Sequence, residues 1–248
     1  MFILSFNFRK FVKRGAVVGL ILILTVLISG TVSAVSRIYR NVKANEAVAA
    51  EPLGQIIVID PGHGGEDCGA VGVTGVYEKD LNLKMAFAVG EKLEKEGYLV
   101  VYTRTEDKLL YNEDENIKGI RKISDLKNRC KIAGAYPDSV FVSIHMNSFG
   151  QSKYSGLQVY YSENKEGSAV LAGHVQSKVS ELVQTDNKRK TKAGDGIYLL
   201  ENISEDAILI ECGFLTNEEE CKKLSEKEYQ NRLSFAIVCG IIEYVKNK

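Results

Sequence analysis

The chain has 248 residues, and its 32 Lys and Arg balance its 32 Asp and Glu to a formal net charge of zero. This length suffices for one domain with a sizeable core, and 45% hydrophobic with 26% charged residues is a globular composition. The neutral balance argues against nucleic acid as a partner. The five cysteines form no CxxC pair and no regular spacing, which excludes a disulfide framework and predicts small buried side chains.

The N-terminal residues differ in kind from the rest. Four basic residues within the first 14 precede an uncharged stretch, residues 16–35, which as a helix would span about 30 Å, the thickness of a bilayer core. This order is typical of an export signal or a signal anchor, and residues 32–34 are small enough for a cleavage site. Both alternatives place the remainder of the chain outside the cytoplasm, either exported or anchored on the outer face of the cytoplasmic membrane.

We therefore expect a signal peptide or membrane anchor (1–36), a mixed linker (37–54) and a folded domain (55–248). Short apolar, β-branched runs predict the strands, at residues 56–59, 99–102, 140–144, 156–161, 197–200 and 207–210. Helical spacing predicts the helices, at residues 81–93, 124–135 with Ser124 as N-cap, 168–183, 218–224 and 226–246. The alternation indicates a single α/β domain with a twisted, mostly parallel sheet flanked by helices.

Four residues able to bind metal or move protons lie at or near the ends of predicted strands. His63 follows the first strand, Glu78 closes a Gly-rich loop, and His145 and Glu211 each directly follow an apolar run. Active sites of open α/β sheets gather at the carboxyl ends of strands. Two histidines and a carboxylate are a common ligand set for catalytic zinc, and Glu211 would be free as the general base.

Each of these residues also has a plain structural interpretation. A single histidine is more often a hydrogen-bonded structural side chain, and a single glutamate is more often a solvated surface charge. Glu211 fits that interpretation least well, because it follows four apolar strand residues. Spacing alone leaves the metal site and the structural interpretation both open.

Four short sequence motifs resemble, in order, the zinc-dependent N-acetylmuramoyl-L-alanine amidases of the Amidase_3 type. The motifs are IDPGHGG at 59–65, EKDLN at 78–82, SIHMNS at 143–148 and ECGFLTN at 211–217. Thr103-Arg104 followed by Asp107 is similar to a further block of that family. The resemblance extends from Gln55 to about Val245.

The resemblance implies one catalytic Zn²⁺ bound by His63, Glu78 and His145, with Glu211 as the catalytic glutamate. It implies hydrolysis of the amide between the lactyl group of N-acetylmuramic acid and L-alanine of the stem peptide, so peptidoglycan is the expected partner. Some members of the family need an accessory activator protein. A small single domain with an N-terminal signal and no wall-binding repeats most resembles the sporulation and germination members, which strip stem peptides from spore-cortex muramic acid toward muramic-δ-lactam.

Two other functions stay open at this point. A zinc peptidase of related architecture would cut within the stem peptide and would differ in its products. An inactive peptidoglycan-binding scaffold would be signalled by loss of Glu211 or of a ligand, and all four residues are present.

The chain departs from the family pattern in places. Cys68 stands where the family often has Pro, and its thiolate is a weaker candidate for zinc than the His and Glu set. Gly134 stands where Asn is common, and the polar stretch 112–124 is longer than in a minimal member. The Gly134 departure affects a local turn rather than the metal ligands.

Several polar residues near the motifs have two interpretations each. Asn82, Asn147 and Asn217 either contact substrate or orient ligands, or else cap helices and turns. Arg104 and Arg129 either bind a stem-peptide carboxylate or, as we favour, form structural ion pairs.

Two features lie away from the motifs. His174 is interpreted as a surface residue within a helix. A basic run, Lys188 to Lys190 with Lys192, is interpreted as a solvated loop, with attraction to anionic wall polymer or lipid headgroups as the alternative.

Overall fold

The computed structural model describes residues 54–248. The expected signal or anchor segment and nearly all of the expected linker lie outside the described residues. Within residues 54–248, no helix is both long enough and apolar enough to cross a membrane.

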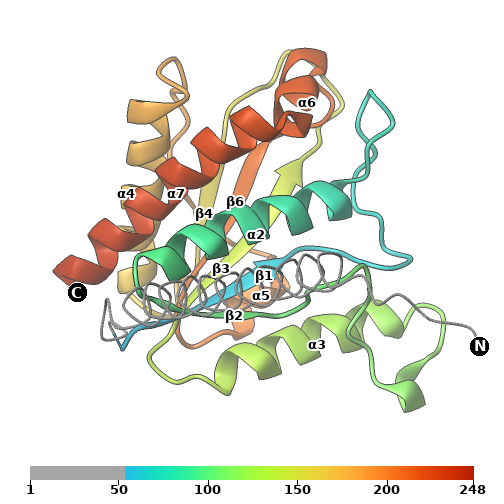
Figure 1. The fold of residues 1–248 in the computed structure, drawn as a ribbon. Helices are drawn as coiled ribbons and strands as arrows, with labels where there is room; N and C mark the ends of the chain where they lie inside the picture. The colour runs from blue at the N-terminus through green and yellow to red at the C-terminus, as the bar shows by residue number, and fades with distance from the viewer. Residues whose placement is uncertain (1–53) are drawn as a thin grey trace, which may run out of the picture. The chain divides into compact units, whose positions relative to one another are not determined.

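A six-stranded sheet forms the centre of the domain, with the strand order β2-β1-β3-β6-β4-β5 (Figure 1). Its strands are β1 (Ile56–Pro61), β2 (Leu99–Tyr102), β3 (Val140–Asn147), β4 (Gln158–Tyr161), β5 (Lys192–Ala193) and β6 (Asp206–Phe214). The β2–β1, β1–β3, β3–β6 and β4–β5 pairs are parallel, and β4 runs antiparallel to β6. The mostly parallel sheet expected from the sequence is therefore confirmed.

Helices cover both faces of this sheet (Figure 1). The helices are α2 (Glu78–Lys95), α3 (Arg121–Gly134), α4 (Gly167–Leu182), α5 (Tyr198–Asn202), α6 (Glu218–Ser225) and α7 (Lys227–Asn247), with a 3₁₀ turn at Glu113–Glu115. Helices α2, α4 and α7 lie on one face, and α3 and α5 lie on the other. This is a three-layer α/β sandwich.

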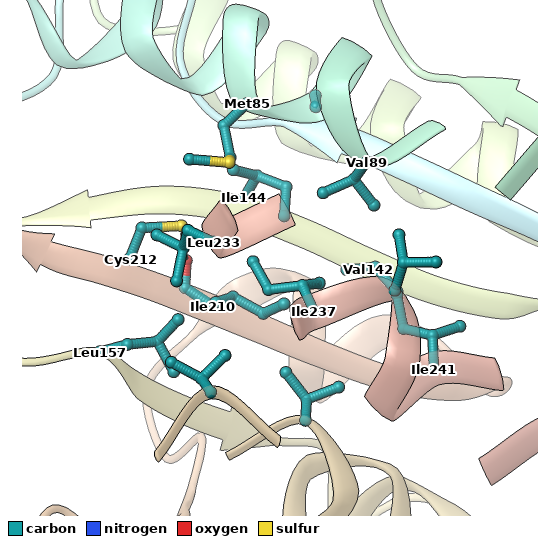
Figure 2. Packing of buried hydrophobic residues seen from close by; sticks show 14 of the residues in the cluster. Met85, Val89, Val142, Ile144, Leu157, Ile210, Cys212, Leu233, Ile237 and Ile241 are labelled. Carbon is teal, nitrogen blue, oxygen red and sulfur yellow. Dashed lines mark hydrogen bonds between the residues drawn. The ribbon is translucent and has the colours of Figure 1, made fainter. Parts of the chain in front are cut away.

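Alternation along the strands divides the apolar residues between two cores. Ile57, Val142 and Ile210 point into the larger core, where Figure 2 shows Val142, Ile144 and Ile210 facing side chains of α2 and α7. Val58 belongs to the smaller core beneath α3 and α5. Because successive side chains of a strand point to opposite faces, the same β-branched runs supply both cores.

The cysteines only partly follow the expectation of burial. Cys212 and Cys221 are fully buried in the larger core, whereas Cys68, Cys130 and Cys239 are partly exposed. All five thiols are free. Within residues 54–248 the fold is therefore held by its two apolar cores and not by disulfide bonds.

The strand expected at residues 197–200 is wrong, because Tyr198–Asn202 forms the short helix α5. Leu199 and Leu200 both pack into the smaller core, which adjacent strand residues on one sheet cannot do. A short apolar run does not distinguish a strand from a buried helix. The edge beside β4 is instead occupied by Lys192–Ala193, which the hydrophobic pattern missed.

The expectation that Ser124 caps a helix is wrong. Helix α3 begins at Arg121, so Ser124 lies within its first turn. The Ser124 hydroxyl accepts a hydrogen bond from the Asn112 backbone N–H at 3.0 Å and donates one to the Glu115 carboxylate at 2.5 Å. These two hydrogen bonds connect the polar segment before α3 to the helix.

A buried polar network lies under the carboxyl end of β1. The Asp60 carboxylate accepts hydrogen bonds from Thr103 at 2.6 Å, Ser143 at 2.7 Å and Arg129 at 2.6 Å. Burial alone would raise the pKa of Asp60, but the Arg129 charge and these hydrogen bonds hold it below its usual range. Arg129 also pairs with Asp125 at 2.8 Å, so the structural ion pair favoured from the sequence is confirmed.

Both arginines of this network hold the backbone that leads to His63. Arg129 donates to the carbonyl oxygens of Pro61 and His63, each at 2.7 Å. Arg104 donates to the Pro61 and Gly62 carbonyl oxygens, each at 2.9 Å. Among residues 54–248 its hydrogen bonds all go to backbone carbonyl oxygens, so the ion pair favoured for Arg104 is wrong. With exposed fractions of 2% for Arg104 and 1% for Arg129, neither guanidinium is free to meet a substrate carboxylate.

Replacing Asp60 with Asn is expected to lower the free energy of unfolding at neutral pH by about 3–5 kcal/mol, because the buried Arg129 loses a charged partner. The folded-state pKa of Asp60 is lowered. Its contribution is therefore fully present above the unfolded-chain pKa of about 3.9 and is lost as the pH falls toward the lower folded value. Urea unfolding of both proteins from neutral pH down to about pH 3 measures this difference. Parallel pH profiles would contradict it.

Candidate active site

His63 is placed by a sharp turn after β1. Its backbone lies in the left-handed region with φ 61°, and the next two residues, Gly64 and Gly65, also have positive φ. Such a conformation is strained for a residue with a side chain and is held by its surroundings, here by the Arg129 hydrogen bond to the His63 carbonyl oxygen. The turn directs the imidazole toward the first residue of α2.

Glu78, that first residue of α2, lies between the two histidines. His63 Nε2 is 3.2 Å and His145 Nδ1 is 3.0 Å from the same atom, Glu78 Oε1. The imidazole centroids are 4.9 Å apart, and the ligand atoms of the three residues all lie within 4.8 Å of one another. The structure therefore brings together the three residues that the sequence singled out as metal ligands.

Backbone groups also fix the Glu78 carboxylate. Oε1 accepts the Met146 N–H at 3.1 Å, and Oε2 accepts the Ala70 N–H at 2.8 Å. Burial alone would raise the pKa of Glu78, but the hydrogen bonds from His145 and His63 hold it well below its usual range. Glu78 is thus an ionised carboxylate in a buried position, which requires a cationic partner.

Glycines make room for this cluster. A Cβ on Gly62 would overlap the imidazole of His145, and a Cβ on Gly69 would overlap both Glu78 and His63. Gly69 also has φ 64°. The Gly-rich stretch around His63 therefore allows the close backbone approach that the sequence suggested.

Asp67 orients His63, and sequence reasoning missed it. Its Oδ2 is 2.9 Å from His63 Nδ1, which leaves Nε2 facing Glu78. Burial alone would lower the pKa of His63, but the hydrogen bonds to Asp67 and Glu78 raise it to about 9. A carboxylate on the far nitrogen is the usual support of a metal-binding histidine. The spacing of four residues from His63 was the signal available in the sequence.

Glu211 lies beside His145 in the sheet, because the two are register partners between β3 and β6. Both strands extend past the ends expected from their apolar runs, so both residues lie within strands. Glu211 Oε2 is buried and has no hydrogen-bond partner among residues 54–248. Burial raises the pKa of Glu211 to about 7, which suits a group that exchanges protons near neutral pH.

A cavity of about 250 Å³ opens over the two histidines. The segment 196–199 and the α3 residues Lys122, Leu126 and Arg129 wall it on the side opposite the sheet. Both histidines are therefore reached from this cavity, which α3 residues help to line.

The three asparagines have different surroundings. Asn82 Nδ2 donates to the Gly62 carbonyl at 3.2 Å and to Glu78 Oε1 at 3.3 Å, so it supports the cluster. Asn217 caps α6 by accepting the Glu220 N–H at 3.0 Å. Asn147 is partly exposed at the end of β3 and accepts the Leu215 N–H through its carbonyl oxygen.

Two other residues considered in the sequence lie outside the cluster. The Cys68 thiol donates to the Gly69 carbonyl at 3.2 Å and is not among the grouped ligand atoms. His174 is partly exposed on α4, with Nδ1 3.7 Å from Glu243. His174 is therefore a surface residue, as expected.

The family model described as N-acetylmuramoyl-L-alanine amidase matches residues 57–243. The chain belongs to this family. The three residues of the cluster and Glu211 all fall inside the matched range, and the fold agrees with that of solved members. The chain is therefore a cell-wall hydrolase acting as an N-acetylmuramoyl-L-alanine amidase.

Three similar proteins span most of the chain. The germination-specific N-acetylmuramoyl-L-alanine amidase of Bacillus subtilis (strain 168) is 36% identical over 195 residues, covering 79% of this chain and 81% of its own. The CwlD amidase of Clostridioides difficile, solved in complex with the GerS lipoprotein, is 40% identical with a TM-score of 0.75 and covers 79% of this chain and 100% of its own. The catalytic domain of CwlV from Bacillus (Paenibacillus) polymyxa var. colistinus is 34% identical with a TM-score of 0.67, covering 78% and 99%.

Replacing Gly62 with Ala is expected to lower the affinity of the amidase for a divalent metal about 100-fold, because the added methyl group displaces the His145 ring. Metal titration monitored by calorimetry measures the loss. Gly173→Ala is the matched control, since a Cβ there meets nothing within 4 Å. If Gly62→Ala kept the wild-type metal affinity, or if both variants lost it equally, the close approach of Gly62 to the His145 ring would be contradicted.

Proposed function

We propose that the amidase is zinc-dependent, with His63, Glu78 and His145 as the three protein ligands and Glu211 as the general base. The observation that carries this is the convergence of two imidazole nitrogens on one buried carboxylate oxygen, at 3.2 and 3.0 Å. Two histidines and a glutamate form the donor set of several zinc hydrolases, with the fourth position open. The unpartnered Oε2 of Glu211 beside His145 fits a site that is completed by a further group.

In this proposal Glu211 transfers the proton and Asp67 orients a ligand. A zinc ion held by His63, Glu78 and His145 would supply Lewis acidity to the scissile carbonyl and would acidify a water molecule at the site. Glu211 takes a proton from the attacking water and returns it to the amine of L-alanine as the amide bond breaks. Asp67 keeps the His63 proton on Nδ1, so that Nε2 stays available as a ligand.

The substrate proposed is the spore cortex, where removal of stem peptides leads toward muramic-δ-lactam. The similarity to the germination-specific amidase of B. subtilis supports this substrate. The CwlD neighbour is bound to a lipoprotein, which supports an accessory activator for this chain as well. Residues 1–36 would export the domain or anchor it on the outer face of the cytoplasmic membrane, with 37–54 as the linker and 55–248 as the catalytic domain.

Replacing Glu211 with Gln is expected to lower the amidase rate on peptidoglycan by about 100- to 10,000-fold while zinc stays bound, since the variant keeps the ligands and loses the proton acceptor. New L-alanine amino termini with intact glycan are the readout, which also distinguishes an amidase from a peptidase cutting within the stem. Glu228→Gln, on an exposed glutamate of α7, is the control. Equal rates in wild type and Glu211→Gln would remove the assigned role.

Zinc removal gives an independent test that needs no substrate. After chelation, adding zinc at 100 times its dissociation constant is expected to raise the free energy of unfolding by about 2.7 kcal/mol, because the ion binds the folded state alone. The gain should vanish in His63→Ala and persist in His174→Ala, whose histidine lies on α4. Stabilisation that survives in His63→Ala would show that zinc binds elsewhere.

A further inference from the structure

A second cavity, of about 560 Å³, lies at the same end of the sheet as the histidine cluster. It is bounded by the segment that follows β3, the loop after α4 and the first turn of α6, which gather at one end of the domain in Figure 1. Lys153, Lys188 and Arg189 are among its lining residues. The basic run interpreted from the sequence as a solvated loop therefore contributes two cations to a concave surface.

Arg189 is held rigidly at this cavity. Its Nε donates to the Ser155 carbonyl at 2.7 Å, and Nη1 donates to Gln158 Oε1 at 3.2 Å. Its Cζ lies 4.5 Å from the centroid of the Phe214 ring. A guanidinium fixed on one edge and stacked on an aromatic ring has already lost most of its side-chain entropy.

Despite this, Arg189 has no anionic partner in the part of the chain that the structure describes. Among residues 54–248 no carboxylate oxygen lies within 4.0 Å of it, and its Nη2 makes no hydrogen bond. The nearby carboxylate of Glu220 is already engaged, accepting the Gly156 N–H at 2.8 Å and the Phe214 N–H at 2.7 Å. A partly buried, preorganised cation with free donors is suited to bind a carboxylate from outside the chain.

The sheet places this cation beside the proposed catalytic base. Gln158, the partner of Arg189, is the register partner of Glu211, which is in turn the register partner of His145. The three therefore lie in one row across β3, β6 and β4, with side chains on the same face. Adjacent strands lie about 5 Å apart, and the Gln158 side chain adds roughly the same length again. The guanidinium of Arg189 is therefore on the order of 10 Å from Glu211.

We propose that Arg189 binds a free carboxylate of the stem peptide, two or three residues beyond the scissile amide. An extended peptide rises about 3.4 Å per residue, so two or three residues span roughly 7 to 10 Å, the same order as this estimated separation. Lys153 and Lys188 add positive charge around the same cavity. This subsite rests on the proposed function for the position of the scissile bond, and it makes Arg189 a specificity-determining residue.

The test compares two forms of a soluble stem peptide that begins with L-alanine, one with its side carboxylates free and one with them amidated. Calorimetry on the full chain is expected to show that wild type binds the free-acid form about 10- to 100-fold more tightly. Arg189→Gln should bring this ratio close to one. Arg189→Lys should recover part of it, since the charge returns without the planar fork.

Lys190→Gln is the matched control, because Lys190 is an exposed neighbour that does not line the cavity. If Arg189→Gln keeps the wild-type preference for the free-acid peptide, the subsite is overturned. Binding to anionic vesicles is measured alongside, and a variant that loses only vesicle binding while keeping that preference would overturn it too. An equal loss for both peptide forms would mean a structural role and would also overturn it. Because binding is measured without turnover, a ratio that depends on Arg189 supports the subsite even if the amidase rate or zinc content contradicts the proposed function.

Discussion

The buried ion pair between Arg129 and Asp60 is the constraint on which the active-site end of the domain depends. Asp60 lies near the carboxyl end of β1, just before the turn. Besides pairing with Arg129, its carboxylate accepts hydrogen bonds from the hydroxyl groups of Thr103, after β2, and Ser143, in β3. Arg129 comes from α3, on the far side of the cavity, and reaches the His63 carbonyl oxygen. One charge pair therefore joins three strands, a helix and the strained turn.

Burying the charges of Arg129 and Asp60 costs desolvation free energy, which explains why both side chains make so many hydrogen bonds. A buried pair of charges stabilises a fold only when the remaining donors and acceptors are satisfied, and here the arginine donates to backbone carbonyl oxygens of the turn. The turn itself is unfavourable, since His63 adopts a left-handed backbone conformation. The polar network thus offsets the strain that aims the imidazole at Glu78.

Features that depend on local pattern could be predicted from the sequence. Short apolar, β-branched runs predicted five of the six strands in some form, and the placement of His145 and Glu211 after such runs put them at the same sheet edge. The helix α5 escaped prediction, because a short apolar run fits two structures equally well. The two-residue strand β5 is too short and too polar to leave a hydrophobic pattern.

Contacts between residues far apart in the chain could not be predicted in this way. Arg129 and Asp60 are 69 residues apart, and Glu78 and His145 are 67 apart, so no spacing rule connects them. The places of Glu78 and His145 near predicted strand ends left a shared metal site open, and the family resemblance then assigned both residues to one site. The sequence could not assign Arg129 to the turn, because that role depends on which side chains the fold turns toward one another.

Because β4 runs antiparallel to β6, its amino end lies at the edge of the sheet where the parallel strands have their carboxyl ends. In parallel strands only carboxyl ends meet at the active-site edge, but β4 brings its first residue, Gln158, to that edge beside Glu211. The chain before β4 and the loop after α4 are therefore drawn to the same place, where Ser155, Gln158 and Arg189 meet. A single row of register partners then carries His145 as the proposed metal ligand, Glu211 as the proposed proton acceptor and Gln158 as the support of a cation, in that order across the sheet. Because strand spacing is nearly constant, the sheet fixes the separation of Glu211 from Gln158. The hydrogen bond to Gln158 then ties Arg189, in the loop after α4, to this row.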